Sequence, residues 1–362
     1  MSKDKLGVLI HGAGWVSTQH IEAYKNNPHT EVVAICSRKL DSARRHAADY
    51  ELVCECYDDL DAALGHKGVD VVSICTPQHV HADNTIAAAQ AGKHILIEKP
   101  AANTPEELKA MRDAVAAAKV KTLVSFVLRW NPLFQTIKSM IADGAVGRVF
   151  CVETAYQSYI SDWWSGWEDA RGESTGRSAF LVGGCHAIDA LRWFAGAGEF
   201  EAARPTEVFA YAGGFRKGGE RQFNYYTNQW HEGAPLEYDG LEMALVRFDN
   251  GVLGKVAVNF EAIQPYKFPI EIFGDRGTIR DNRVWSHKYP GQTDWVQIPT
   301  ILPDSSDVTH HPFQGQIDHF VDCILSDTES HCNLADAAAT HEVAFAALEC
   351  YRTGRPVSLP PS

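Results

Sequence analysis

The stretch that decides the fold is Leu6–Ser17, LGVLIHGAGWVS. Its mostly apolar first half, Leu6–His11, predicts a buried strand. The following Gly12-Ala-Gly14-Trp-Val-Ser17 matches the Gly-x-Gly-x-x-Gly pattern of dinucleotide-binding domains, with serine in the third place. Gly12 would permit the tight turn, Gly14 would let a pyrophosphate approach the backbone, and Ser17 is small enough for helix–strand packing. The segment therefore predicts a dinucleotide site at the start of a parallel α/β sheet.

The first third of the chain alternates apolar runs with amphipathic segments. We expect strands at Leu6–His11, Val32–Cys36, Val69–Cys75, Ile95–Ile97 and Leu123–Val127. We expect helices at about Thr18–Asn26, Asp41–Ala48, Ala82–Ala91 and Thr104–Lys119. The last of these opens with a threonine N-cap, a proline and two glutamates, which is typical of a helix start. Strands that alternate with helices predict a doubly wound parallel sheet, the Rossmann architecture.

After about Arg129 the pattern changes. A helix is expected at Pro132–Ala142, followed by strands at Val149–Tyr156, Thr206–Ala212, Met243–Phe248, Val252–Phe260, Lys267–Phe273 and Thr278–Asp281. Asp249-Asn250-Gly251 is a tight hairpin signal between two of these strands, which favours antiparallel pairing. Helices resume at about Phe313–Leu325 and Ala335–Thr353, and they are candidates to pack back on the first domain. We predict a Rossmann domain over residues 1–128 and an α+β substrate-binding and oligomerisation domain over residues 129–362, with a large, mostly antiparallel open sheet.

The composition limits the class of protein. The 362 residues exceed a typical single core, and 45% hydrophobic with 22% charged residues is ordinary for a soluble globular protein. The formal net charge of -13 disfavours a nucleic-acid partner, which would require a basic face. No stretch approaches the roughly 20 apolar residues of a membrane helix, and the N-terminal run is too short for a signal peptide. We therefore expect a cytoplasmic protein without a membrane partner, whose nine scattered cysteines are reduced.

Metal binding is not expected. Cys54-Glu-Cys56 has no second cysteine pair nearby to complete a zinc site. His79 and His81 lack an evident third ligand, and the pair His310-His311 has no support as a metal site.

The cofactor preference is expected to depend on the end of the second strand. An acid there usually binds the ribose 2′-hydroxyl of NAD, but this chain has Ser37 and Arg38. A serine and an arginine can bind a 2′-phosphate, so the pair favours NADP; alternatively Arg38 is a surface charge and the protein takes NAD. The full set of expected cofactor-binding residues is Gly12, Gly14, Trp15, Val16, Ser37, Arg38, Thr76, Pro77, His79, His81, Glu98 and Lys99.

Two clusters could handle protons. Lys99, in Glu98-Lys99-Pro100, follows a strand at the carboxyl edge of the sheet, where its ammonium could bind a reacting hydroxyl; alternatively it forms a surface pair with the glutamate. His186 and Asp189 lie one helical turn apart, so the carboxylate could orient the imidazole; alternatively the histidine is structural.

Together these motifs resemble the Gfo/Idh/MocA family, named for glucose–fructose oxidoreductase and inositol dehydrogenase. The matching segments, in family order, are Gly12–His20, Thr76–His81, Glu98–Pro100, Arg129–Pro132, Gly144–Gly147, Gly183–Asp189 and Gly274–Ile279. The resemblance implies Lys99 and His186 as catalytic groups and an outer sheet face that makes homodimers or homotetramers. Many family dehydrogenases carry an aspartate four residues before the histidine, where this chain has Val182. Either His186 acts with Lys99 alone, or another acid enters the site.

The expected substrate is a sugar, glycoside or cyclitol. Tyr156 and Trp163 belong to an aromatic-rich segment, and aromatic rings with polar tips suit carbohydrate faces; the alternative is core packing. The full set of expected substrate-binding residues is Lys99, Arg129, Tyr156, Trp163, His186 and Asp189. The leading hypothesis is reversible hydride transfer at a secondary alcohol. The alternatives are a glycosidase or lyase that uses tightly held NAD for transient oxidation, as some relatives in this family do, and a non-catalytic ligand sensor on the same fold.

Overall fold

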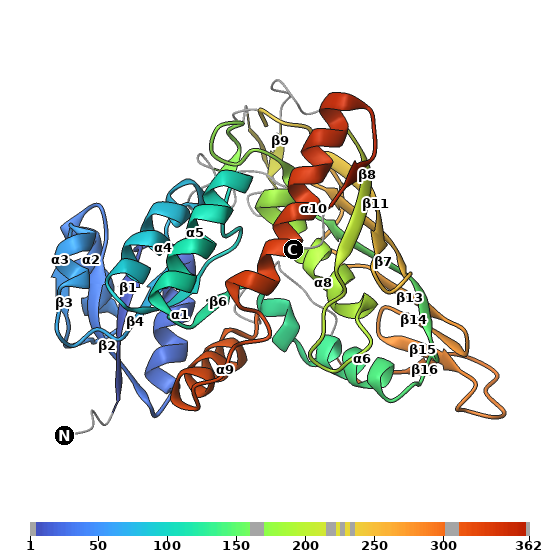
Figure 1. Ribbon diagram of the computed structural model, residues 1–362, viewed down its shortest axis with the longest axis horizontal. Helices are drawn as coiled ribbons and strands as arrows, with labels where there is room; N and C mark the ends of the chain where they lie inside the picture. The colour runs from blue at the N-terminus through green and yellow to red at the C-terminus, as the bar shows by residue number, and fades with distance from the viewer. Residues whose placement is uncertain are drawn as a thin grey trace. The chain divides into compact units, whose positions relative to one another are not determined.

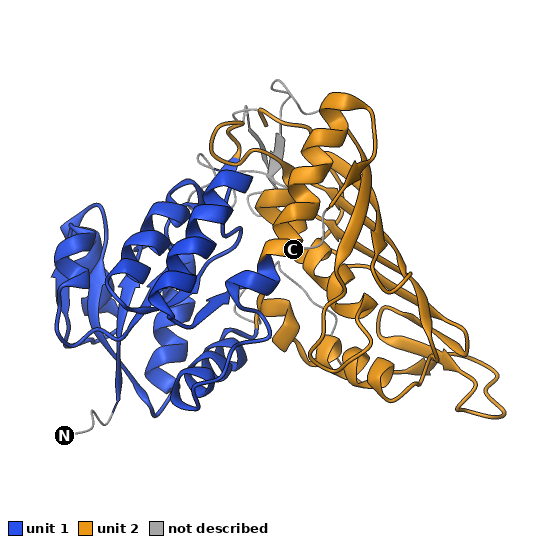
Figure 2. Ribbon diagram, in the orientation of Figure 1, with its two compact units in different colours: residues 1–125, 164–170, 312–337 blue, residues 126–163, 171–311, 338–362 orange. Residues whose placement is uncertain are grey.

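The computed structural model describes residues 5–159, 170–214, 222–224, 229–231, 236–300 and 311–359. The chain divides into two compact units, which are described separately. Unit 1 comprises residues 1–125, 164–170 and 312–337, and unit 2 comprises residues 126–163, 171–311 and 338–362 (Figure 2).

Unit 1 contains a six-stranded parallel sheet in the order β3-β2-β1-β4-β5-β6. Its strands are β1 Leu6–His11, β2 Thr30–Cys36, β3 Glu55–Tyr57, β4 Val71–Ile74, β5 His94–Ile97 and β6 Thr122–Val124. The predicted Rossmann sheet is confirmed, because the order reverses beside β1, where the glycine motif begins. The short edge strand β3 was not predicted, since three residues carry too little periodicity to stand out.

The α-helices of unit 1 join or flank these strands (Figure 1). They are α1 Trp15–Asn26, α2 Leu40–Asp49, α3 Leu60–Leu64, α4 His81–Gln90, α5 Pro105–Ala118 and α9 Phe313–Leu325, with a 3₁₀ turn η1 at Gln78–Val80. The predicted start of α5 is confirmed by a complete capping box, in which Thr104 accepts from the Glu107 amide and Glu107 reaches back to the cap. Helix α9 packs against α1, where Asn27 Nδ2 donates to Asp318 Oδ1 at 2.7 Å.

Two strand predictions in this region were too long, since the strand expected at Val69–Cys75 is only β4, Val71–Ile74. Strand β6 ends at Val124 instead of Val127, and residues Val127–Trp130 form the 3₁₀ turn η2. The backbone leaves the extended conformation at Phe126, whose ψ is 64°. An apolar run alone does not distinguish a strand from a buried turn, which explains the error.

Unit 2 contains a nine-stranded sheet in the order β16-β15-β14-β13-β7-β12-β11-β8-β17. Its strands are β7 Val149–Gln157, β8 Pro205–Gly213, β11 Leu241–Phe248, β12 Leu253–Asn259, β13 Ile270–Gly274, β14 Gly277–Arg280, β15 Arg283–Ser286, β16 Val296–Gln297 and β17 Val357–Ser358. Every neighbouring pair is antiparallel except β12 with β7, so the predicted open, mostly antiparallel sheet is confirmed. A separate pair, β9 Gln222–Asn224 and β10 Gln229–His231, is antiparallel.

The predicted hairpin between β11 and β12 is also confirmed. Gly251 adopts a φ of 85°, which glycine tolerates without strain. The strand predicted from Lys267 begins instead at Ile270, and Lys267 makes only an isolated bridge with Gln157.

Helices of unit 2 cover one face of this sheet, with α8 packed on β7 and β12 and on α6 (Figure 1). They are α6 Pro132–Ala142, the π-helix η3 Phe180–Gly184, α8 Cys185–Ala195 and most of α10 Leu334–Thr353, which begins in unit 1. Strand β11 alternates buried and exposed residues: Ala244 and Val246 are buried, whereas Met243 and Leu245 are 45% and 59% exposed. The neighbouring Tyr211 is 68% exposed, so the second face of the sheet presents apolar side chains at the surface of the chain.

In the parts of the chain that the structure describes, no helix combines the length and apolar character needed to cross a bilayer.

Candidate functional site

The glycine loop has the geometry that a dinucleotide requires. Gly12 adopts a φ of 115°, and a Cβ at this position would lie 2.4 Å from the carbonyl oxygen of Cys75. Helix α1 begins after Gly14, a cap residue that has no side chain to accept from the first helical amides. Gly12 is therefore required by its positive φ and by the close approach of the Cys75 backbone, and the start of α1 after Gly14 offers the positive end of a helix dipole, which fits the pyrophosphate of the cofactor that the motif implies.

The third position of the motif, Ser17, is tightly packed, as expected for a small residue between helix and strand. Ser17 is fully buried, and its hydroxyl donates to the carbonyl oxygen of Gly14 at 2.6 Å. Trp15 and Val16, the other expected contacts, form the first turn of α1, with Trp15 39% exposed.

The ribose end of the expected site lies after β2. Ser37 is half-buried, with its amide donating to Tyr57 at 3.0 Å, and Arg38 is exposed. Burial raises the pKa of the neighbouring Cys36 thiol to about 12, and the Asp59 and Asp58 carboxylates, which follow β3, contribute further. Sequence reasoning looked for an acid after β2 and did not consider the end of β3.

The Thr76–His81 loop is held by a histidine. His81 is 1% exposed, and its Nδ1 and Nε2 each lie 2.7 Å from a backbone carbonyl oxygen, that of Pro100 and that of Thr76. Burial lowers the pKa of His81, against the two carbonyls, which favour its charged form. Both ring nitrogens thus lie against backbone carbonyls, and His81 stays an expected cofactor contact on this loop. Pro77 and His79 remain expected contacts on the same loop, which Asn84 braces through a 3.0 Å hydrogen bond to the Thr76 hydroxyl.

Lys99 lies just beyond the carboxyl end of β5 and is half-buried. The preceding Glu98 is 6% exposed, and its Oε1 lies 2.9 Å from Nε2 of His20. Burial tends to raise the pKa of Glu98, but the hydrogen bond and charge of His20, together with Lys99, lower it overall. The glutamate is therefore an ionised, buried group, which excludes the simple surface pair considered as the alternative.

His186 lies in the first turn of α8, directly after the π-helix η3. It is 7% exposed, and its ring centroid is 6.2 Å from that of Phe126. The two glycines of the motif allow the segment to approach the sheet: a Cβ on Gly183 would lie 3.0 Å from Phe260, and one on Gly184 would lie 2.9 Å from Val258. The glycines before the histidine are thus required for packing.

The start of η3 is anchored by a carboxylate that sequence reasoning missed. Glu242, on β11, accepts from the amides of Ala179 and Phe180 at 3.1 and 2.8 Å. Burial raises the pKa of Glu242 to about 8, against the two amides, which lower it. Val182, at the position where the family resemblance has an aspartate in many dehydrogenases, is buried within this π-helix.

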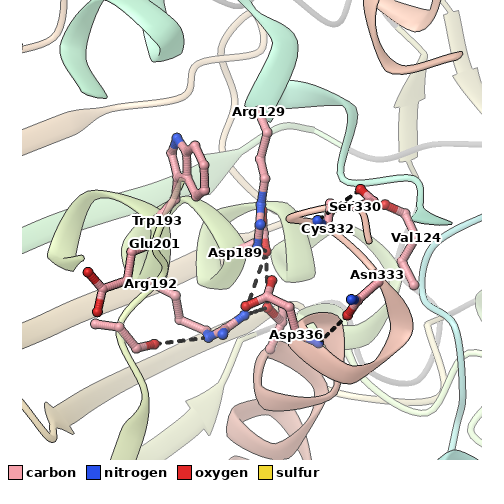
Figure 3. A network of polar contacts seen from close by, with 12 residues as sticks. Val124, Arg129, Asp189, Arg192, Trp193, Glu201, Ser330, Cys332, Asn333 and Asp336 are labelled. Carbon is pink, nitrogen blue, oxygen red and sulfur yellow. Dashed lines mark hydrogen bonds and ion pairs between the residues drawn. The ribbon is translucent and has the colours of Figure 1, made fainter. Parts of the chain in front are cut away.

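Two of the expected substrate residues bind each other (Figure 3). Arg129 Nε and Nη2 donate to the two carboxylate oxygens of Asp189 at 2.8 and 2.6 Å, and the side chains are 1% and 4% exposed. Thr340 donates to the same carboxylate at 3.1 Å, and the guanidinium lies 4.7 Å from the Trp193 ring. The structure therefore pairs Asp189 with Arg129, a partner that helical spacing does not predict.

The remaining expected substrate residues are aromatic. Tyr156 is 7% exposed and packs edge-on against Phe260 and Tyr266, with ring centroids 5.9 and 5.0 Å away. Trp163 lies outside the described residues. Within the described ranges, no group of three or more His, Cys, Asp or Glu side chains could hold a metal ion.

Comparisons with known proteins agree with this geometry. Residues 6–126 match the model described as "Oxidoreductase family, NAD-binding Rossmann fold", and residues 134–280 match the "GFO/IDH/MocA C-terminal domain". A levoglucosan dehydrogenase from Pseudarthrobacter phenanthrenivorans is 29% identical over 76% of this chain and 73% of its own length. A scyllo-inositol 2-dehydrogenase (NAD(+)) from Bacillus subtilis is 26% identical over 83% and 81%. A solved levoglucosan dehydrogenase in complex with NADH shares the fold, with a TM-score of 0.84, 22% identity, and coverage of 99% of this chain and 100% of that one.

Proposed function

Because the chain belongs to the Gfo/Idh/MocA family of NAD-binding oxidoreductases, we propose that it transfers hydride between a nicotinamide cofactor and a secondary alcohol or ketone of a sugar, glycoside or cyclitol. The observation that carries the proposal is the glycine turn before α1, whose helix N-terminus can receive a pyrophosphate, on the same sheet edge as Lys99. The named relatives that act on levoglucosan and scyllo-inositol support this class of substrate.

We assign the proton chemistry to two residues. The nicotinamide, when bound, supplies the hydride acceptor or donor. Lys99 hydrogen-bonds the reacting hydroxyl and stabilises developing negative charge on its oxygen, and His186 takes or gives the hydroxyl proton. The sequence resemblance supports both roles. Glu242 and two glycines hold the π-helix that precedes His186, which suits a side chain whose orientation must be fixed.

The first experiment identifies the cofactor and the substrate. Bound nucleotide is released from the purified protein and identified by mass, and a panel of sugars and cyclitols is then screened at the absorbance band of reduced nicotinamide. Lys99→Ala and His186→Ala should each lower kcat/KM by about 10²–10⁴-fold, and His186→Ala should leave cofactor affinity near wild type. Lys93→Ala is the matched control, because Lys93 is also half-buried and precedes the same strand. Full turnover in the Lys99 variant would refute its role.

We further propose that the cofactor is NADP. Ser37 and Arg38 follow β2, where they can bind a 2′-phosphate, and no acid occupies that position. Ser37→Asp places a carboxylate there, so the ratio of kcat/KM values for NADP and NAD should shift towards NAD by at least about tenfold. An unchanged ratio would refute the assignment.

A second candidate function is favoured by Val182. A valine cannot accept a proton or a hydrogen bond, so the site lacks one group that many family dehydrogenases use. A glycosidase or lyase that uses NAD for transient oxidation would cleave glycosides without net change in nicotinamide absorbance. Product analysis by chromatography alongside the absorbance assay separates the two reactions, and binding of cofactor and sugar with neither reaction would point to a sensor.

We also propose that the exposed face of the unit 2 sheet makes a homodimer or homotetramer. Met243, Leu245 and Tyr211 supply apolar side chains on adjacent strands of that face. Contiguous exposed apolar surface of this kind is typical of an interface.

A further inference from the structure

The residues on both sides of Lys99 are held by buried histidines. His81 lies against the carbonyl of Pro100, on one side, and His20 lies against the carboxylate of Glu98, on the other. The two contacts differ in kind, because His81 holds a neutral carbonyl group whereas His20 faces a charged one. His20 also belongs to α1, the helix that begins at the glycine loop. The contact between His20 and Glu98 therefore links the expected cofactor loop to the segment that carries Lys99.

The buried carboxylate of Glu98 needs a compensating charge. Its side chain is 8% exposed and that of His20 is fully buried, so solvent contributes little to its stabilisation. The hydroxyl of Ser125 also bonds Glu98, and Ser125 in turn accepts from Nε2 of Gln316 at 3.1 Å. These donors supply hydrogen bonds but no charge. His20 is the group that hydrogen-bonds this carboxylate and can carry a full positive charge, while the buried His81 and the half-buried Lys99 also interact with it electrostatically.

The other side of the imidazole is compatible with protonation. Nδ1 of His20 lies 2.7 Å from Oγ of Ser73, a hydroxyl that can accept, and the ring packs against Phe313 of α9 with centroids 5.3 Å apart. The titratable groups recorded against His20 and Glu98 are Cys75 after β4, His81 and Lys99, and Tyr24 of α1 lies against Ser73 and Cys75. Burial alone would lower the pKa of His20, but Cys75 and the Glu98 carboxylate outweigh it and raise the pKa to about 10.

We propose that His20 is a positioning residue for Lys99: as an imidazolium it neutralises the buried Glu98 carboxylate, so that the adjacent lysine does not face an uncompensated negative charge. Lys99 interacts electrostatically with Glu98, so a change in the net charge of the His20–Glu98 pair acts on the lysine. This inference rests on the proposed catalytic role of Lys99.

The charge on His20 is tested first, without cofactor or turnover. The ¹⁵N resonances of the histidine rings are recorded in the intact protein between pH 6 and about 8.5, and the His20 signals are assigned by their loss in His20→Gln. Both ring nitrogens should show the protonated signature across this range. A neutral ring at pH 7 would overturn the proposal.

The coupling to Lys99 is tested by variants that change the charge in opposite directions. His20→Gln leaves Glu98 uncompensated, so Lys99 should hold its proton more tightly and the Lys99-dependent limb of the kcat/KM profile should move up by about one pH unit. Glu98→Gln leaves the imidazolium uncompensated, so the same limb should move down. The double variant restores a neutral pair and should return the profile towards wild type. A residue that is merely structural would give neither opposite shifts nor rescue.

A second measurement follows Lys99 itself and distinguishes the proposed catalytic role of Lys99 from its positioning by His20. The pH dependence of its modification by an amine-reactive reagent is followed by mass spectrometry in the cofactor-free protein, and it should shift in the same directions. His94→Gln, at the amino end of the same strand, is the matched control and should leave both profiles unchanged. If modification shifts but Lys99→Ala retains full turnover, the proposed function fails and the positioning of the lysine stands. If modification is unchanged in all variants, the positioning role is refuted.

Discussion

The ion pair between Arg129 and Asp189 leads to the sharpest prediction about stability, made through Asp189→Asn. The substitution preserves the size of the side chain but removes its charge. Two charged hydrogen bonds, at 2.8 and 2.6 Å, then become contacts between a guanidinium and a neutral amide. Because the arginine side chain is 1% exposed, water does not replace the lost charge. Breaking one side of a buried pair costs about 3–5 kcal/mol, so the free energy of unfolding of unit 2 should fall by about that amount.

Urea unfolding followed by tryptophan fluorescence measures this change, since Trp193 lies against the same guanidinium. Asp113→Asn is the matched control: Asp113 pairs with Lys109 on α5, but the two side chains are 64% and 78% exposed. That substitution should change the free energy of unfolding by no more than about 1 kcal/mol.

The outcome distinguishes a structural pair from a substrate contact. If Asp189 binds substrate, Asp189→Asn should raise KM while the unfolding midpoint stays near wild type. A loss of stability below about 1 kcal/mol together with such a rise in KM would refute the reasoning, because a buried charge pair cannot be broken so cheaply.

Three further predictions concern other parts of the chain. In the wild type, the free energy of unfolding should be highest below the ordinary carboxyl pKa of 4.5 and should fall as pH rises towards about 8, by up to about 1.4 kcal/mol per pH unit, because the folded state favours the protonated Glu242. Glu242→Gln copies the protonated carboxyl, so its profile should be flatter. An equal slope in both proteins, measured by urea unfolding, would contradict this prediction. Gly12→Ala introduces a Cβ 2.4 Å from a carbonyl oxygen at a φ of 115°, so calorimetric titration should show at least about tenfold weaker dinucleotide binding. Gly92→Ala is the control, because Gly92 also has a positive φ but has open space around the Cβ, so it tests the cost of positive φ alone. Leu245→Lys adds a charge to the exposed sheet face and should shift the mass in sedimentation towards the monomer; an unchanged mass would exclude this face as the interface.

Local patterns in the sequence were sufficient for the framework of both units. The alternation of apolar runs with amphipathic segments predicted the parallel sheet, and the Thr104 cap and the Gly251 hairpin marked element boundaries that the structure confirms. The glycine turn before α1 and Lys99 after β5 both lie at the carboxyl edge of the parallel sheet, as the sequence pattern predicted. These features are readable because backbone periodicity, capping and turn geometry depend on residues that are close together in the chain.

The tertiary structure alone decided which polar groups meet. Asp189 pairs with Arg129 across 60 positions, and His20 reaches Glu98 across 78. Glu242, on the interior strand β11, anchors the π-helix before His186, although the alternation of β11 marks its position only as buried. Each of these partners is chosen by how strands and helices pack, and no spacing in the sequence encodes it. Burial then sets the consequence, since a charge removed from water must find an opposite charge or a set of donors wherever the fold brings one.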